Sequence, residues 1–164
     1  MTDAISASQQ RVADVLARHD IAARIVTFDA STRTAADAAQ AIGCDVAQIA
    51  KSIILKAKPS QRLVLVVTSG RNRVCEKTVA ELVGEKVGRA DADFVRVKTG
   101  FAIGGVAPVA HIEEPITLID EDLLTYAELW AAAGTPNSVF RLTPTELVAL
   151  TTGRVARVKE ENPA

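Results

Sequence analysis

The sequence predicts a single domain of the mixed α/β class. Its 164 residues are typical of one domain with its own hydrophobic core. Segments with strand patterns and segments with helix patterns are interspersed, without the regular alternation of a doubly wound sheet. The strongest strand signal is the run RLVLVVTS at 62–69. Its continuous apolar and β-branched residues are typical of a strand that is covered on both faces.

The residues before this run predict three helical segments and two strands. Helical segments are expected at 6–19, 32–43 and 45–50, and strands at 23–28 and 51–57. The first helix has apolar residues at helical spacing and a serine that can cap its start. These residues are Val12, Val15, Leu16 and His19, with Ser6 or Ser8 as the cap.

The residues after the run predict three helices and two more strands. Helices are expected at 76–84, 91–100 and 142–151, and strands at 115–120 and 153–158. A glycine ends each of the first two helices. The third helix begins with a capping box, in which Thr143 is the cap, Pro144 takes the first position and Glu146 the third. The tail from Lys159 is expected to be frayed.

The composition excludes several classes of protein. The two cysteines, Cys44 and Cys75, are too few for a disulfide framework and show no metal-ligand spacing with His19 or His111. We therefore expect no metal and no other cofactor. The chain start lacks the pattern of a signal peptide, and no apolar run approaches the roughly 18 residues of a membrane span. We expect a cytoplasmic protein with no membrane partner.

Charge is unevenly distributed along the chain. The net charge is −1, but residues 51–98 hold 11 of the 19 basic and only 5 of the 20 acidic residues. Two interpretations remain open. The clustering is accidental and lies on solvated faces, or the segment forms a positive surface for a phosphate-bearing partner. The net charge argues against strong nonspecific nucleic-acid binding, and we expect no DNA partner.

The segment VKTGFAIGGVAPVAH, residues 97–111, is rich in glycine. Three glycines and a proline suit neither a helix nor a strand, but they suit backbone that must approach another group closely. The chain has no phosphate-loop, GxGxxG or GxSxG motif. A glycine-rich loop, a lysine at a strand start and a positive middle segment suit an anionic or carbonyl-bearing ligand held by backbone amides.

Four segments together resemble one family. They are STRTAADAAQAIGC, QIAKSIILKA, LVLVVTSGRNRV and TGFAIGGVAPVAH. In this order they are similar to the YbaK/ProX family, which is related to the editing domain of bacterial prolyl-tRNA synthetases. The similarity covers about residues 22–158 of one domain spanning 1–164. It implies a central barrel-like mixed sheet surrounded by helices, and a free-standing deacylase that removes a wrong amino acid from tRNA, most often the proline tRNA.

The resemblance also implies which residues form the site. The family's strand-start lysine falls on Lys51, and its GxxxP loop runs from Gly104 through Gly105 to Pro108. Backbone amides of the loop would stabilise the oxyanion of ester hydrolysis, and Lys51 would bind the carbonyl oxygen or the terminal phosphate. No general base is evident, so the substrate's own ribose hydroxyl or amino group would activate water.

Other residues keep two interpretations. His111 lines the pocket or makes a structural hydrogen bond. Ser31, Thr32 and Thr34 cap a helix or face the pocket. Arg71 and Arg73 are solvated or contact tRNA. The expected partners are the acceptor end of an aminoacyl-tRNA and a synthetase that delivers it. The alternative function is a module that binds tRNA or a synthetase without catalysis.

Overall fold

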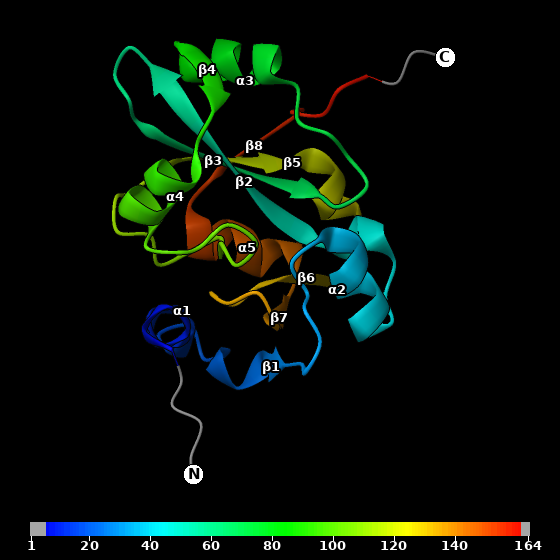
Figure 1. Cartoon of the computed structure of the whole chain (residues 1–164). Helices are drawn as coiled ribbons and strands as arrows, with labels where there is room; N and C mark the ends of the chain where they lie inside the picture. Colours follow the sequence, from blue (N-terminus) through cyan, green and yellow to red (C-terminus); the bar gives the residue numbers. More distant parts are fainter. Residues whose placement is uncertain (1–5, 162–164) are drawn as a thin grey trace.

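The computed structural model describes residues 6–161. Within them the helices are α1 (Ala7–Ala17), α2 (Ala35–Ile42), α3 (Glu76–Val83), α4 (Ala92–Thr99) and α5 (Pro144–Thr151). The strands are β1 (Ile25–Thr27), β2 (Ala50–Lys58), β3 (Leu63–Ser69), β4 (Lys86–Arg89), β5 (Ile116–Asp120), β6 (Leu129–Ala132), β7 (Ser138–Leu142) and β8 (Arg154–Ala156). The expected mixed α/β fold is confirmed (Figure 1).

The strands form two sheets rather than one closed barrel. One sheet has the order β1–β7–β6 and the other the order β4–β2–β3–β5–β8. A single bridge between Ile49 and Trp130 connects the start of β2 to β6. The larger sheet is mixed, because β3 runs antiparallel to β2 and parallel to β5. The central sheet is therefore mixed, as expected, but it is divided at this bridge.

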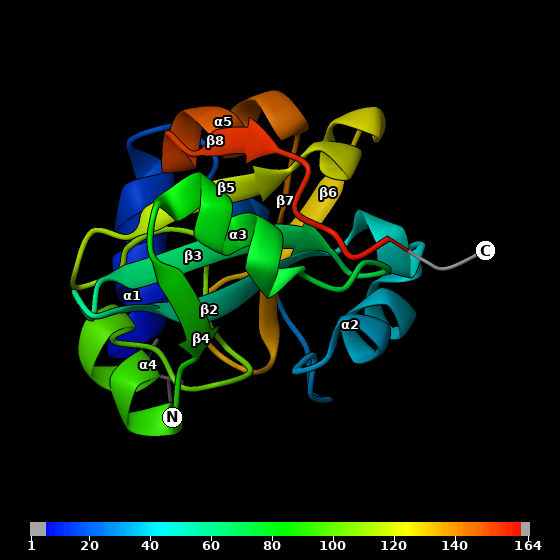
Figure 2. The same ribbon diagram turned by 90° about the horizontal axis from the view of Figure 1, so that it is seen from above.

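Strand β3 is the centre of the fold, and all seven of its residues are buried. Leu65 and Val67 pack in the same core as Leu16 of α1 and Leu147 of α5. Val64 and Val66 point to the other face and pack with α3. Figure 1 shows α3 and α1 at opposite ends of the molecule, and in Figure 2 α3 lies in front of the larger sheet and α1 behind it. The prediction of a strand covered on both faces is confirmed.

The predicted helix ends follow from side-chain and glycine caps. Thr34 accepts a hydrogen bond from the N–H of Asp37 and starts α2, and Gly43 ends that helix at φ 85°. The capping box of α5 is formed by Thr143 and Glu146. The segment 45–50 contains a 3₁₀ turn (Val46–Gln48), and Ser6 caps α1.

Three expectations were wrong or incomplete. His19 lies beyond the end of α1 and is exposed, so it is not part of the buried stripe. Lys159 is not frayed, because it bridges to Val74 and its ammonium pairs with Asp122 at 2.8 Å; residues 162–164 lie outside the described chain. The strands β4, β6 and β7 were not predicted. In residues 6–161, no helix combines the length and the apolar character needed to cross a membrane.

Candidate functional site

A cavity of about 410 Å³ lies beside the first half of β2. Most of its lining is apolar, and the lining residues come from α2 and the segment before it, β2, the end of β4, α4 and the loop after it, β6 and β7. The apolar side chains include Ile49, Ile54, Val95, Ile103, Val106 and Trp130. Among the described lining residues, three are basic and none is acidic; the basic ones are Arg33, Lys51 and Arg89. The cavity therefore suits a small, partly apolar ligand with a negative charge near it.

One wall of the cavity is a free edge of β2. Strand β4 pairs only with Leu55–Lys58, so residues 50–54 have no ladder partner in the described chain on the side away from β3. Backbone groups of odd-numbered residues point to β3: the Ile49 carbonyl accepts from Gly70 N, and Ala57 N donates to the Arg62 carbonyl. Alternate residues of a strand turn their backbone groups to opposite neighbours. Ser52 therefore presents its N–H and C=O groups to the open edge, and Ile54, next to the last pair with β4, presents its N–H.

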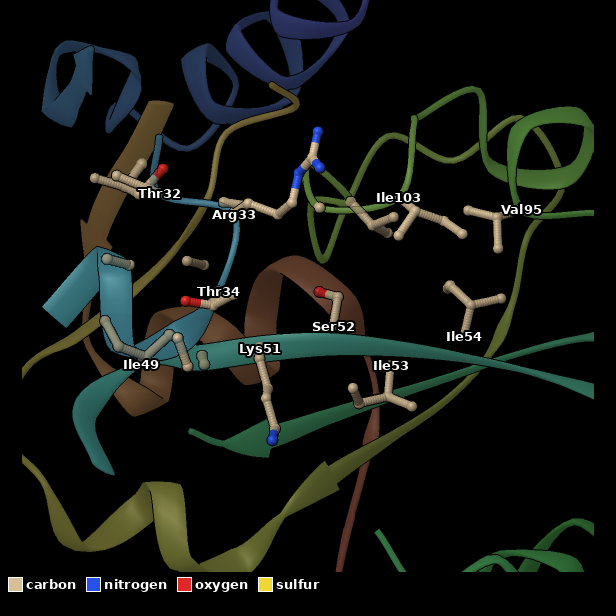
Figure 3. A pocket seen from close by; sticks show the side chains of 18 of the residues that line it. Thr32, Arg33, Thr34, Ile49, Lys51, Ser52, Ile53, Ile54, Val95 and Ile103 are labelled. Carbon is tan, nitrogen blue, oxygen red and sulfur yellow. The ribbon is translucent and has the colours of Figure 1, made fainter. Parts of the chain in front are cut away.

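Ser52 places a hydroxyl without a partner in this wall. Its Oγ is buried and is the one buried side-chain N or O without a hydrogen bond in residues 6–161. Figure 3 shows Ser52 and Ile54 on one side of β2, facing Arg33 and Ile103. A buried hydroxyl without a partner carries a desolvation cost of roughly 1–3 kcal/mol. A ligand atom that bonds to Ser52 would remove that cost.

Lys51 lines the cavity but directs its ammonium group elsewhere. In Figure 3 its side chain leaves β2 on the side opposite to Ser52. Burial lowers the pKa of Lys51 below its usual range, and the positive charge of Arg73 lowers it further. The structure thus brings Lys51 to the cavity by its strand position, and the side chain can reach a ligand only around the open edge of β2.

The loop of residues 100–111, here called the glycine loop, forms the opposite wall through Gly104. Gly104 takes φ 93° in a turn closed by a hydrogen bond from Gly105 N to the Ala102 carbonyl at 3.0 Å. The positive φ requires glycine at this turn position. The N–H of Gly105 is used in this turn, so Gly105 is not available as an oxyanion donor, contrary to the expectation.

Each glycine of the pair lies against another segment. A Cβ on Gly104 would meet Arg33 Cγ at 2.5 Å, and a Cβ on Gly105 would meet the Thr135 carbonyl carbon at 2.8 Å. Arg33 therefore lies directly over Gly104 at the cavity mouth. Gly105 lets the glycine loop pack against the backbone of the β6–β7 turn. These two close approaches explain why the segment 97–111 has glycine at positions 104 and 105.

The three hydroxyl residues before α2, Ser31, Thr32 and Thr34, have different roles. Thr34 caps α2 and also lines the cavity. Ser31 is exposed and does not line it; its Oγ accepts from Arg33 N at 3.1 Å. Thr32 is buried, lines the cavity and donates to the Pro136 carbonyl at 3.2 Å. Both interpretations therefore apply to Thr34, while Ser31 orders the segment that carries Arg33.

Pro108 and His111 lie on the far side of the glycine loop. They line a second cavity of about 460 Å³ and not the first. His111 Nε2 is 2.7 Å from the Ala107 carbonyl, and its ring meets Phe101 edge-on at 5.7 Å. Burial lowers the pKa of His111 to about 4, against a partial rise from the Ala107 hydrogen bond. The ring is therefore neutral at pH 7 and makes the structural hydrogen bond.

Arg71 and Arg73 do not line the cavity. Arg71 is exposed and pairs with Asp45 at 3.4 Å. Arg73 is exposed, and its charge acts on Lys51. In residues 6–161, no group of three or more His, Cys, Asp or Glu side chains could hold a metal ion.

Comparison with known proteins identifies the family. The model of the aminoacyl-tRNA editing domain matches residues 29–150. The chain belongs to the aminoacyl-tRNA editing domain family. This confirms the resemblance drawn from the four segments, and the matched range contains the cavity, β2 and the glycine loop.

Relatives of this editing domain cover most of the chain. It is 31% identical over 123 residues to the uncharacterized protein YwhH of Bacillus subtilis, covering 75% of this chain and 78% of that one. A solved structure of a candidate trans-editing enzyme for prolyl tRNA synthetase has 44% identity and a TM-score of 0.88, over 96% of this chain and all of the other. The hypothetical protein APE2540 has 32% identity and a TM-score of 0.78, over 84% and 91% of the two chains.

Sequence reasoning missed most of the residues that line the editing-domain cavity, among them the polar or aromatic ones Ser52, Arg33, Arg89 and Trp130. A signal existed for Ser52, because it alternates with Lys51 along a predicted strand and so faces the other way. Arg33 stands between two predicted pocket residues. Arg89 and Trp130 lie on or beside strands that were not predicted, and no local signal indicated them.

Proposed function

We propose that this chain is a deacylase that hydrolyses the ester between a wrongly attached amino acid and the terminal ribose of a tRNA, with the proline tRNA as the first candidate. The observation that carries the proposal is the cavity between the free edge of β2 and Gly104. Its apolar walls suit a small side chain. Its volume is at the lower end of the range for small-molecule sites, roughly 300–1,000 Å³.

The lining provides the interactions that ester hydrolysis needs. Water adds to the ester carbonyl carbon, and the bond to the ribose oxygen breaks. The products are the free amino acid and the tRNA hydroxyl, which takes up the proton. Ser52, Ile54 and Gly104 line the cavity, and in this proposal their backbone N–H groups would stabilise the oxyanion. Losing one such donor typically costs about 10²–10³ in rate.

The charges of the lining match a tRNA acceptor end. Arg33 and Arg89 are exposed at the cavity, and Lys51 lies at the edge of β2. A nucleotide that places its ribose at the cavity brings its phosphate to these cations, and guanidinium groups bind phosphate well. An α-ammonium group would meet no carboxylate among the described lining residues. Backbone carbonyls of the β2 edge would accept its hydrogen bonds instead.

The proton acceptor comes from the substrate in this proposal. The described lining contains no His, Asp or Glu, and the neutral His111 belongs to the second cavity. A ribose hydroxyl next to the ester, or the α-amino group once it has lost its proton, would activate water. An ester is already a reactive bond, so positioning and oxyanion stabilisation supply the remaining rate.

The test is deacylation of the proline tRNA charged with Cys, Ala, Ser or Thr, with correctly charged proline tRNA as the control. We expect hydrolysis of at least one mischarged form well above its spontaneous rate and little effect on the control. Measurement of tRNA binding on the same preparation separates the alternative function. Binding without hydrolysis of any charged form would replace the deacylase proposal with a non-catalytic tRNA-binding module.

A further inference from the structure

Arg11 of α1 contacts both ends of the glycine loop. Its Nη2 donates to the Thr99 carbonyl at 3.2 Å, and its Nε donates to the Ala110 carbonyl at 3.4 Å. The neighbouring Val12 is fully buried and, with Leu16, fixes α1 on the core. Arg11 therefore holds the two ends of the loop together from a rigid helix.

The first acceptor is a place where positive charge is favourable. Thr99 is the last residue of α4, so its carbonyl lies at the negative end of the helix dipole. The same guanidinium lies over the ring of Phe101, 4.9 Å from its centroid, in a cation–π contact. Within residues 6–161, Arg11 forms no ion pair. The described polar and cation–π contacts of this guanidinium are thus all made to Thr99, Phe101 and Ala110, at the ends of the glycine loop.

The second acceptor belongs to a strained residue. Ala110 takes φ 67°, a left-handed conformation that costs an alanine roughly 1–2 kcal/mol. The hydrogen bond from Arg11 to its carbonyl favours this conformation. At the other end, Gly100 has φ 81° and no Cβ, and a Cβ there would overlap Arg11 Nη2. The loop and Arg11 are therefore complementary at both ends.

We propose that Arg11 is a positioning residue that fixes the glycine loop so that Gly104 stays at the cavity. The kinetic part of this inference rests on the proposed function. Lysine could not replace Arg11 fully, because one ammonium group cannot reproduce the fork that reaches two carbonyls and stacks on Phe101. Arg11 lies before the range 29–150 matched by the family model, so the match to the family assigns it no role.

The kinetic test compares Arg11→Ala and Arg11→Lys with the control Arg18→Ala, which removes an exposed arginine from the end of the same helix. For Arg11→Ala we expect kcat for deacylation to fall about 10- to 100-fold, because a small misplacement of the loop is costly. KM should stay nearly constant, since Arg11 does not line the cavity. The kcat of Arg11→Lys should lie between those of the wild type and Arg11→Ala. Added guanidinium should restore part of the kcat of Arg11→Ala and should not raise the kcat of the other variants.

A second readout does not depend on activity. The Ile112 N–H donates to the Thr99 carbonyl at 3.2 Å, so its hydrogen exchange should be faster in Arg11→Ala. The His111 pKa, followed by NMR, should rise, because the Arg11 cation contributes to lowering it. If Arg11→Ala does not fold, the Ile112 exchange rate, the His111 pKa and kcat are measured on Arg11→Lys instead, and they decide whether Arg11 positions the loop.

Wild-type kcat in Arg11→Ala, or reduced kcat with unchanged Ile112 exchange and no rescue by guanidinium, would overturn the inference. Wild-type protein that hydrolyses no charged tRNA would instead reject the proposed function, and the exchange measurement would still decide whether Arg11 holds the loop.

Discussion

The substitution Gly105→Ala tests whether the glycine loop must touch the β6–β7 turn. The added Cβ would stand 2.8 Å from the Thr135 carbonyl carbon, 3.0 Å from its Cα and 3.1 Å from Pro136 N. All three atoms are backbone, so no side chain can rotate away. Gly105 does not have a positive φ, so the whole effect comes from overlap. Inserting a methyl group into such a packed contact typically costs about 1–3 kcal/mol.

The expected result has a thermal and a kinetic part. For a chain of this size, each kcal/mol lowers Tm by about 2–4 °C. The loop must move away from the turn, which carries Gly104 with it, so we expect kcat for deacylation to fall about 100-fold.

The matched control is Gly88→Ala, where the Cβ would meet only the flexible Lys58 side chain, at 3.2 Å from Nζ. Scanning calorimetry and single-turnover deacylation are measured on both variants. Wild-type melting and turnover in Gly105→Ala would refute the reasoning, because they would mean that the contact carries no constraint.

Three further predictions concern charge. Burial lowers the pKa of His111 from 6.5 to about 4. As the pH falls, the His111 imidazole is therefore protonated in the unfolded chain before it is protonated in the folded protein. The free energy of unfolding should therefore fall by about 2 kcal/mol between pH 7 and pH 5, and His111→Gln should flatten this decline in denaturant titrations. Lys51→Ala should lower deacylation at least about tenfold with an unchanged melt; normal turnover would make Lys51 an ordinary edge residue. Arg33→Ala/Arg89→Ala should weaken tRNA binding and flatten its salt dependence by nearly one log–log unit per lost phosphate contact, and Arg71→Ala should not. If filter binding shows that Arg71→Ala weakens tRNA binding as much as Arg33→Ala/Arg89→Ala does, the assignment of the phosphate contacts to Arg33 and Arg89 is wrong.

The sequence predicted the helices and the central strands because their signals are local. Glycine and hydroxyl caps marked the ends of α2 and α5, and an apolar run marked β3. Strands β4, β6 and β7 have four or five residues each and no continuous β-branched run like that of β3. Length alone did not hide them, because β1 and β8, with three residues each, were predicted. Such short strands are stabilised by pairing with distant segments, as β7 is between β1 and β6, and a single-sequence pattern does not contain that information.

The site was predicted in part for the same reason. Lys51 and Gly104 stand in recognisable local motifs, and both reach the cavity. Pro108 and His111 belong to the same motif but lie on the other side of the loop, because backbone spacing does not determine which cavity a side chain lines. Arg11 is far from the motif in sequence, and only the fold brings it to Ala110.

The cavity itself results from a mismatch of strand lengths. Strand β2 has nine residues, whereas β4 has four and pairs only with its second half. A fully paired β2 would use the backbone groups of Ser52 and Ile54 in a ladder and leave none for a ligand. An open sheet edge is a liability unless something covers it. Here the glycine loop and α2 stand over that edge without pairing to it, which leaves a space walled by backbone donors and acceptors. Any substitution that extended β4 toward Ala90 would therefore be expected to close the site while stabilising the sheet.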